Sequence, residues 1–129
     1  MKLFLATPAS MSDEKATTIR NQLSQAIAND KIEIVLAADD YRENFAELGG
    51  WAPWIMHVST GVDYMTRKPV YEMIICVQRF VGKATHQIVQ QALHAGKIVG
   101  LFADGTIHTV RGVRQVDGEN WVDGWEIVT

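Results

Sequence analysis

The sequence MIICV at residues 73–77 is the most apolar run in the chain. A β-strand that is apolar on both faces is typical of the interior of a parallel sheet, because helices cover such a sheet on both sides. Three further apolar runs lie at residues 2–6 (KLFLA), 32–37 (IEIVLA) and 97–103 (KIVGLFA). The run at 73–77 is therefore expected to be a central strand of a sheet that also contains the other three.

Helical patterns separate these four runs. Apolar residues recur at helical spacing between residues 16 and 27, with polar residues on the opposite side. Residues 85–93 give a second one-sided helix, with Thr85 as its expected N-cap and Gly96 after its end. Residues 41–68 have a looser pattern, for which we expect short helices. The order along the chain is therefore strand, helix, strand, helical region, strand, helix, strand.

This repeated βαβ order predicts the fold. Right-handed crossovers turn it into a parallel sheet with helices on both faces. We expect an α/β fold, a flavodoxin- or Rossmann-like three-layer sandwich with strand order 2-1-3-4. A two-residue Asp-Gly turn at 104–105 is a hairpin signal, so residues 106–110 should return antiparallel beside the fourth strand. Residues 114–116 and 125–128 are expected as short strands around a second Asp-Gly turn at 117–118.

Length and composition indicate one globular domain. The chain has 129 residues, of which 47% are hydrophobic and 21% charged, so a single core can form and a disordered or low-complexity chain is excluded. We expect one α/β domain over residues 1–129, with the βαβ core at 1–103 and a C-terminal β-hairpin extension at 104–129.

Charge and cysteine content limit the partners and the compartment. A formal net charge of −3 provides no basic field for duplex nucleic acid, and a single cysteine excludes a disulfide framework within the chain and fits a reducing cytoplasm. The apolar run at the N-terminus is about four residues, against the roughly 7–15 of a signal-peptide core. No run approaches the about 20 residues of a membrane span. We therefore expect a cytoplasmic protein that does not contact membrane.

The predicted topology also locates a candidate site. In a doubly wound sheet, ligands bind beyond the carboxyl ends of the strands, where the strand order reverses. Three loops should meet there, at residues 7–11, 39–41 and 81–87. The first and third run into helix N-termini, whose free N–H groups and dipole attract an anion. A phosphate or a carboxylate is the expected ligand group.

Candidate binding residues lie in these loops and in the Gly- and Pro-rich segment that follows the second strand. They are Thr7, Pro8, Ser10, Asp39, Tyr41, Trp51, Trp54, Gly82 and Thr85. Each has a purely structural alternative: the hydroxyls can cap helices, the acidic pair can form a solvated turn, and the tryptophans can cover the core.

Candidate catalytic residues are fewer. Asp40 could act as a general base or hold a ribose hydroxyl. His86 lies at an expected helix N-terminus, where the dipole favours a neutral imidazole that can donate or accept, and Gln87 follows it. The four histidines lack metal-ligand spacing, so no metal and no cofactor are expected. Cys76 lies within a strand, where burial raises a thiol pKa.

Several motifs together resemble the nucleoside 2-deoxyribosyltransferase-like superfamily over about residues 1–103. They are the opening LFLATP at 3–8, the DDY segment at 39–41, the apolar strand at 71–77, the turn at 82–85 and the Gly-Lys pair at 96–97.

The resemblance implies cleavage of an N-glycosidic bond, by a hydrolase or transferase whose nucleophile is a glutamate near the start of the third helix. The matching residues 86–89 contain Gln87 and no carboxylate, and an amide cannot be that nucleophile. Glu72 is acidic where the family often is, but it lies at the wrong end of its strand. The implied nucleoside pocket is unaffected by this departure.

Two functions follow from these observations. The first is a nucleoside- or nucleotide-binding protein of this superfamily, either an N-glycosidase or deoxyribosyltransferase or a binder that has lost catalysis. The second is a small phage- or mobile-element-type protein that binds a partner or sequesters a nucleotide without enzymatic activity. A homo-oligomer is compatible with both, and whether the chain is an enzyme stays open.

Overall fold

The computed structural model describes residues 1–123. The elements in chain order are β1 (Lys2–Ala6), α1 (Asp13–Ile27), β2 (Glu33–Leu36), α2 (Ala37–Leu48), α3 (Trp51–Thr60), β3 (Met73–Cys76), β4 (Phe80–Val81), α4 (Lys83–His94), β5 (Ile98–Ala103), β6 (Thr106–Thr109), β7 (Gly112–Val116) and β8 (Glu119–Asp123).

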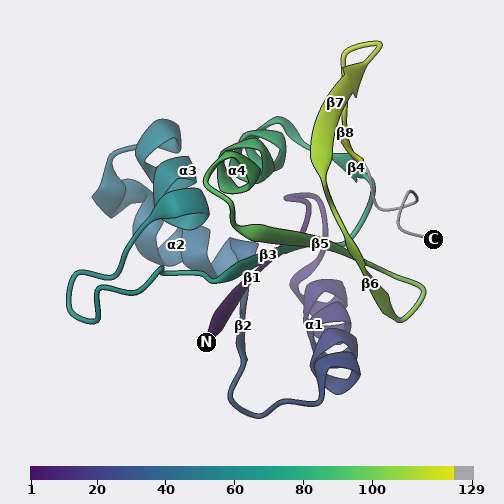
Figure 1. The fold of residues 1–129 in the computed structure, drawn as a ribbon, viewed down its shortest axis with the longest axis horizontal. Coiled ribbons are helices and arrows are strands. Elements are labelled where there is room, and N and C mark those ends of the chain that lie inside the picture. The colour runs from purple at the N-terminus through teal and green to yellow at the C-terminus, as the bar shows by residue number, and fades with distance from the viewer. Residues whose placement is uncertain (124–129) are drawn as a thin grey trace.

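The main sheet has five strands in the order β2-β1-β3-β5-β6 (Figure 1). The first four are parallel and β6 is antiparallel to β5. The predicted order 2-1-3-4 with an antiparallel strand beside the fourth is therefore confirmed. β3 lies in the middle of the sheet, and its residues Ile74, Ile75 and Cys76 are fully buried. The uniformly apolar run thus marks the central strand.

Helices cover both faces of this sheet, so the protein is a three-layer α/β fold. Figure 1 shows α1 on one face and α2, α3 and α4 on the other. The protein has two hydrophobic clusters, one on each face of the sheet, and alternate residues of β1 belong to each. Leu3 and Leu5 pack with α1, whereas Phe4 and Ala6 pack with the three other helices. This alternation follows from the two-residue period of a strand.

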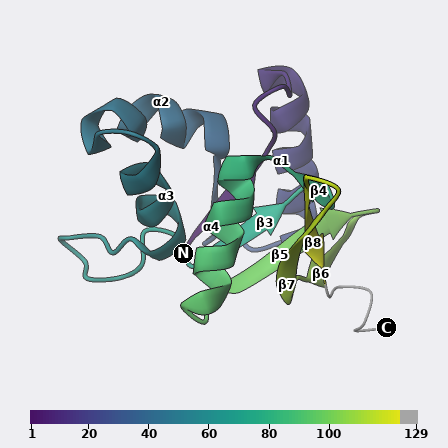
Figure 2. The same ribbon diagram turned by 90° about the horizontal axis from the view of Figure 1, so that it is seen from above.

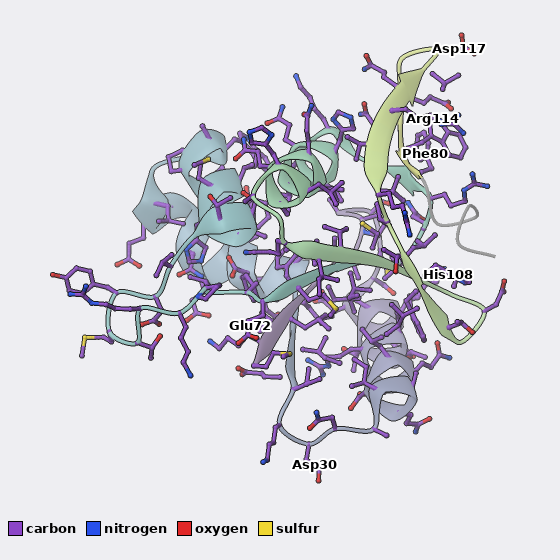
Figure 3. The ribbon with its side chains drawn as sticks, in the orientation of Figure 1. Asp30, Glu72, Phe80, His108, Arg114 and Asp117 are labelled. Atoms are coloured by element: carbon purple, nitrogen blue, oxygen red, sulfur yellow. The ribbon has the colours of Figure 1, made fainter. Side chains whose placement is uncertain are left out.

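A second, three-stranded antiparallel sheet has the order β4-β8-β7. It lies on the far side of α4 from α3 (Figures 1 and 2), and Phe80 and Arg114 mark it in Figure 3. The segment after residue 103 thus contributes to two sheets: β6 pairs with β5, whereas β7 and β8 form a second hairpin whose strand β8 pairs with β4. Residues 80–81 form this short strand instead of the predicted loop.

The second hairpin differs from the prediction in its returning strand. Asp117 and Gly118 both have positive φ, which fits a two-residue turn whose geometry makes the chain return at once. The strand after the turn is therefore β8, immediately adjacent, while the predicted strand at 125–128 lies outside the described residues. Asp104 and Gly105 have the same backbone geometry between β5 and β6, as predicted.

Two helices begin earlier than predicted. α2 begins at Ala37, directly after the last residue of β2, so residues 39–41 lie in its first turn and not in a loop. α4 begins at Lys83 with Gly82 as its N-cap, so Thr85 is the third helical residue and not the cap. In both cases good helix formers extend the helix back to the point where the strand or a glycine stops it.

Candidate functional site

A cavity of about 580 Å³ opens at the carboxyl ends of β1 and β2, where the strand order reverses. Its volume lies within the range of small-molecule sites. Its lining comprises Phe4, Thr7, Pro8, Ala9, Met11, Asp13 and Ala16 from β1 to α1, Ala37, Ala38, Tyr41 and Arg42 from α2, Trp51 and Trp54 from α3, and Thr85 and Ile88 from α4.

Three aromatic rings form one wall of this cavity. The ring centroid of Tyr41 lies 5.6 Å from that of Trp51 and 5.6 Å from that of Trp54, and the two indoles are 6.0 Å apart. Trp54 is 4% exposed, whereas Trp51 is 54% and Tyr41 38% exposed. Trp54 therefore belongs to the core, and the rings of Tyr41 and Trp51 stay partly exposed at the cavity, with Phe45 stacked on the Tyr41 ring at a centroid distance of 4.4 Å.

Polar groups also line the cavity. Thr7 is buried directly after β1, and Pro8 accepts a hydrogen bond from the amide of Met11 (3.0 Å), which closes the turn before α1. Thr85 of α4 lines the same cavity. The segments after β1 and at the start of α4 thus lie at one site, as the topology predicts.

The charged side chains at the cavity are ion-paired with one another. The Arg42 guanidinium contacts Asp13 of α1 at 2.9 Å and Asp39 of its own helix at 3.2 Å. Both bonds use the Oδ1 atom of the carboxylate. Asp39 lies one turn before Arg42, so the pair was recognisable in the sequence, but the contact with Asp13 spans 29 residues and depends on the fold. Sequence reasoning named neither Asp13 nor Arg42 as a site residue.

Asp40 lies behind the aromatic wall and is 3% exposed. Its carboxylate accepts hydrogen bonds from the Trp54 indole (Nε1 to Oδ1, 2.8 Å) and from the Tyr71 hydroxyl. The His57 Nε2 atom lies 3.7 Å from its Oδ2. Burial, and then the hydrogen bond to Asp40, raise the pKa of Tyr71, so that hydroxyl stays a donor. Asp40 thus fixes the orientation of Trp54 and does not reach the cavity.

The predicted site residues divide into two groups. Those in the cavity lining are Thr7, Pro8, Tyr41, Trp51, Trp54 and Thr85. Those outside it are Ser10, Asp39, Asp40, Gly82, His86 and Gln87. Ser10 is exposed in the turn before α1, where Ser12 is the N-cap, and Asp40 is buried, not part of a solvated turn.

Gln87 lines a neighbouring cavity of about 410 Å³, together with Trp51, Ile55, Lys83 and Ala84. Trp51 separates this cavity from the first, because it lines both. The amide of Gln87 and the ammonium of Lys83 are therefore the polar groups on the far side of that indole.

Few groups at the cavity could carry out covalent chemistry. Among residues 1–123, Asp13 is the single carboxylate that lines it, and Arg42 pairs with this carboxylate. Glu72 precedes β3, so it lies at the end of the sheet opposite the cavity (Figure 3). Cys76 is fully buried, and desolvation raises the pKa of its thiol to about 12, as predicted from its place in the strand.

Residues 1–123 were examined for metal-binding clusters and for membrane-spanning helices. No three His, Cys, Asp or Glu side chains in this range gather as a metal site would require. In the same range, no helix is both long and apolar enough to cross a bilayer.

A scan against protein-family models, a search of curated proteins and a search of solved structures each found no match to the chain.

Proposed function

We propose that the protein binds a nucleoside or nucleotide in the cavity at the reversal of strand order. The observation that carries this proposal is the pairing of exposed aromatic rings with polar groups in one cavity of suitable size. The position of the cavity adds support, because doubly wound sheets bind ligands at this point.

The base would stack on the aromatic wall. Tyr41 and Trp51 line the cavity with partly exposed rings. Every nucleobase has a flat π-face that can stack on such rings, so stacking does not depend on which base is present. Thr7 and Thr85, which line the same cavity, would hydrogen-bond the sugar or the edge of the base. An apolar ligand without hydroxyls would leave these groups unpaired.

Binding without covalent glycosyl transfer is the form of this function that the site supports best. A glycosyl-enzyme intermediate needs a free carboxylate beside the sugar. Asp40 is buried behind Trp54 with two hydrogen-bond donors on it, and Asp13 has its Oδ1 paired with Arg42, which leaves Oδ2 as its remaining acceptor. Gln87, in the place that the resemblance gives to the nucleophile, lines the neighbouring cavity.

Isothermal titration calorimetry with the common nucleosides and their 5′-monophosphates tests the proposal. Trp51→Ala should weaken binding roughly tenfold or more, because one base–aromatic stack contributes about 1–3 kcal/mol. Tyr64→Ala is the matched control: that ring is 93% exposed in the segment between α3 and β3, outside the cavity lining, and its loss should leave affinity unchanged.

Two results would contradict the proposal: no heat from any of these ligands at millimolar concentration, or equal affinities for Trp51→Ala and the unaltered protein. Chromatography of a bound nucleoside after long incubation separates the two forms of the function. Recovery of intact nucleoside is expected, and release of free base would show an N-glycosidase.

A further inference from the structure

The charges at the cavity are arranged unfavourably for a phosphate. Among the lining residues, Asp13 and Arg42 carry charge, and the guanidinium of Arg42 is already shared by two carboxylates, at 2.9 Å from Asp13 and 3.2 Å from Asp39. One cation between two anions leaves the group with a net negative charge. Lys83, the nearest cation on α4, lines the neighbouring cavity beyond Trp51.

At the N-termini of α1 and α2 the helix dipoles do not reverse this balance, whereas α4, whose Thr85 lines the cavity, has no acidic residue in its first turn. α1 carries Asp13 and Glu14 in its first turn, and α2 carries Asp39 and Asp40. These carboxylates already occupy the positive ends of both helices, where an anionic ligand group would otherwise be stabilised. A phosphate at this mouth would compete with two carboxylates for Arg42 and would be repelled by both.

The same carboxylates that repel a phosphate can accept hydrogen bonds from a neutral ligand with hydroxyl groups. The bonds from Arg42 use Oδ1 of Asp13, and its Oδ2 atom faces no bond from that guanidinium. A carboxylate oxygen accepts strongly from a hydroxyl, and such charge-assisted bonds are stronger than neutral ones. The guanidinium holds the carboxylate in place for this contact, so its rotation is restricted before the ligand arrives.

We propose that the Asp13–Arg42–Asp39 group makes the cavity select an uncharged nucleoside against its 5′-monophosphate, with Asp13 accepting from a sugar hydroxyl and Asp39 keeping Arg42 away from phosphate. This inference rests on the proposed function and narrows it. Asp39 acts through Arg42, so it is a positioning residue, whereas Asp13 would touch the ligand.

The test compares the four ribonucleosides with their four 5′-monophosphates by calorimetry. The unaltered protein should bind the best nucleoside roughly tenfold more tightly than its monophosphate, because like charges brought together oppose binding. Asp39→Asn should raise the monophosphate affinity about fivefold or more and leave the nucleoside affinity within about twofold, since it frees one side of Arg42 without changing a ligand contact.

Glu47→Gln provides the matched control. Glu47 is exposed in the last turn of α2, so this change removes the same charge from the same helix at a distance from the cavity. Its ratio of nucleoside to monophosphate affinity should equal that of the unaltered protein. Raising the salt concentration should narrow the preference of the unaltered protein, because all three members of the ion-paired group are partly exposed to solvent.

The outcomes separate the inference from the function on which it rests. If neither ligand class binds, the proposed function fails. If the monophosphate binds as tightly as the nucleoside, or if Asp39→Asn and Glu47→Gln give the same ratio, the function stands and the selectivity mechanism is overturned. Asp13→Asn should weaken nucleoside binding while circular dichroism and the melting temperature stay close to those of the unaltered protein, because the side chain is exposed.

Discussion

At the scale of single residues, the two adjacent carboxylates of α2 show how strongly helix phase decides a role. Asp39 is exposed and pairs with Arg42, whereas Asp40 is 3% exposed and bonded to Trp54 and Tyr71. The sequence marked both as candidates, and it could not separate them. Their difference depends on contacts with α3 and with a residue 31 positions away, which local patterns do not contain.

Replacing Asp40 therefore has a large effect on stability. Asp40→Ala should lower the free energy of unfolding by about 2–4 kcal/mol, because it leaves the buried indole N–H and phenol O–H without an acceptor. Asp40→Asn should cost less, since its amide oxygen still accepts from Trp54. Urea denaturation measures both changes.

Asp39→Ala is the internal reference for that experiment. It removes an exposed carboxylate from the same turn, and an exposed pair of this kind contributes only about 0.3–0.5 kcal/mol. Equal losses for Asp39→Ala and Asp40→Ala would show that the buried hydrogen bonds carry no stability.

At the scale of elements, apolar periodicity and Asp-Gly turns predicted the strands of the main sheet and the central place of β3. Two features could not be predicted this way. β4 has two residues and gains its pairing from β8, about forty positions later, so no local pattern marks it. α2 follows β2 without a connecting residue, and the acidic pair that favours a helix start was interpreted as a turn.

The segment between α3 and β3 is an ordered element without regular secondary structure. The Oδ1 atom of Asp63 accepts from the amides of Met65 (2.8 Å) and Thr66 (3.0 Å), and its backbone N–H donates to the carbonyl of Lys68 (2.7 Å). Tyr64 and Met65 are 93% and 88% exposed there. Hydrogen bonding, and not burial, therefore holds the part of this segment from Asp63 to Lys68.

The stability of the hydrogen-bonded turn at Asp63 should depend on pH. The backbone hydrogen bonds from Thr66 and Met65 lower the pKa of Asp63 below its ordinary 3.8. The ionised form is thus favoured in the fold, so the stabilisation is complete above pH 3.8 and is lost as the pH falls through the lowered pKa.

Amide NMR resonances of Met65 and Thr66 would follow this loss. They should shift together, with a midpoint below 3.8, and their hydrogen exchange should lose protection over the same range. Asp63→Asn should abolish the transition. A midpoint above 3.8 in the unaltered protein would contradict the hydrogen-bonded arrangement.

At the scale of the whole molecule, the two sheets share one core. Val110, just after β6, and Val122 of β8 are 2% and 0% exposed and belong to the same cluster as Phe4 and Trp54. The amide of Val122 also donates to the carbonyl of Arg79 beside β4 (2.9 Å). The second sheet therefore packs into the same hydrophobic core as the first, and we expect the two to unfold together.

Val122→Ala should destabilise the entire protein, by on the order of 2 kcal/mol, because it opens a cavity in this shared core. Thermal unfolding followed by far-ultraviolet circular dichroism and by tryptophan fluorescence should give one coincident transition that moves to lower temperature. Val116→Ala, at a 44% exposed position of β7, is the control and should leave the transition nearly unchanged. Separate transitions for the two probes would contradict a single unit.

The direct junction between β2 and α2 has a mechanical consequence for ligand capture. Leu36 is paired with Leu5 of β1, and the helix begins at the next residue, so there is no slack at this corner. We therefore expect α2 to keep its position relative to the sheet when a ligand binds. On the other side of the cavity, residues 7–12 separate β1 from α1, and we expect this longer connection to be the part that adapts. Accommodation of different ligand sizes therefore falls on the side where Thr7 and Pro8 lie.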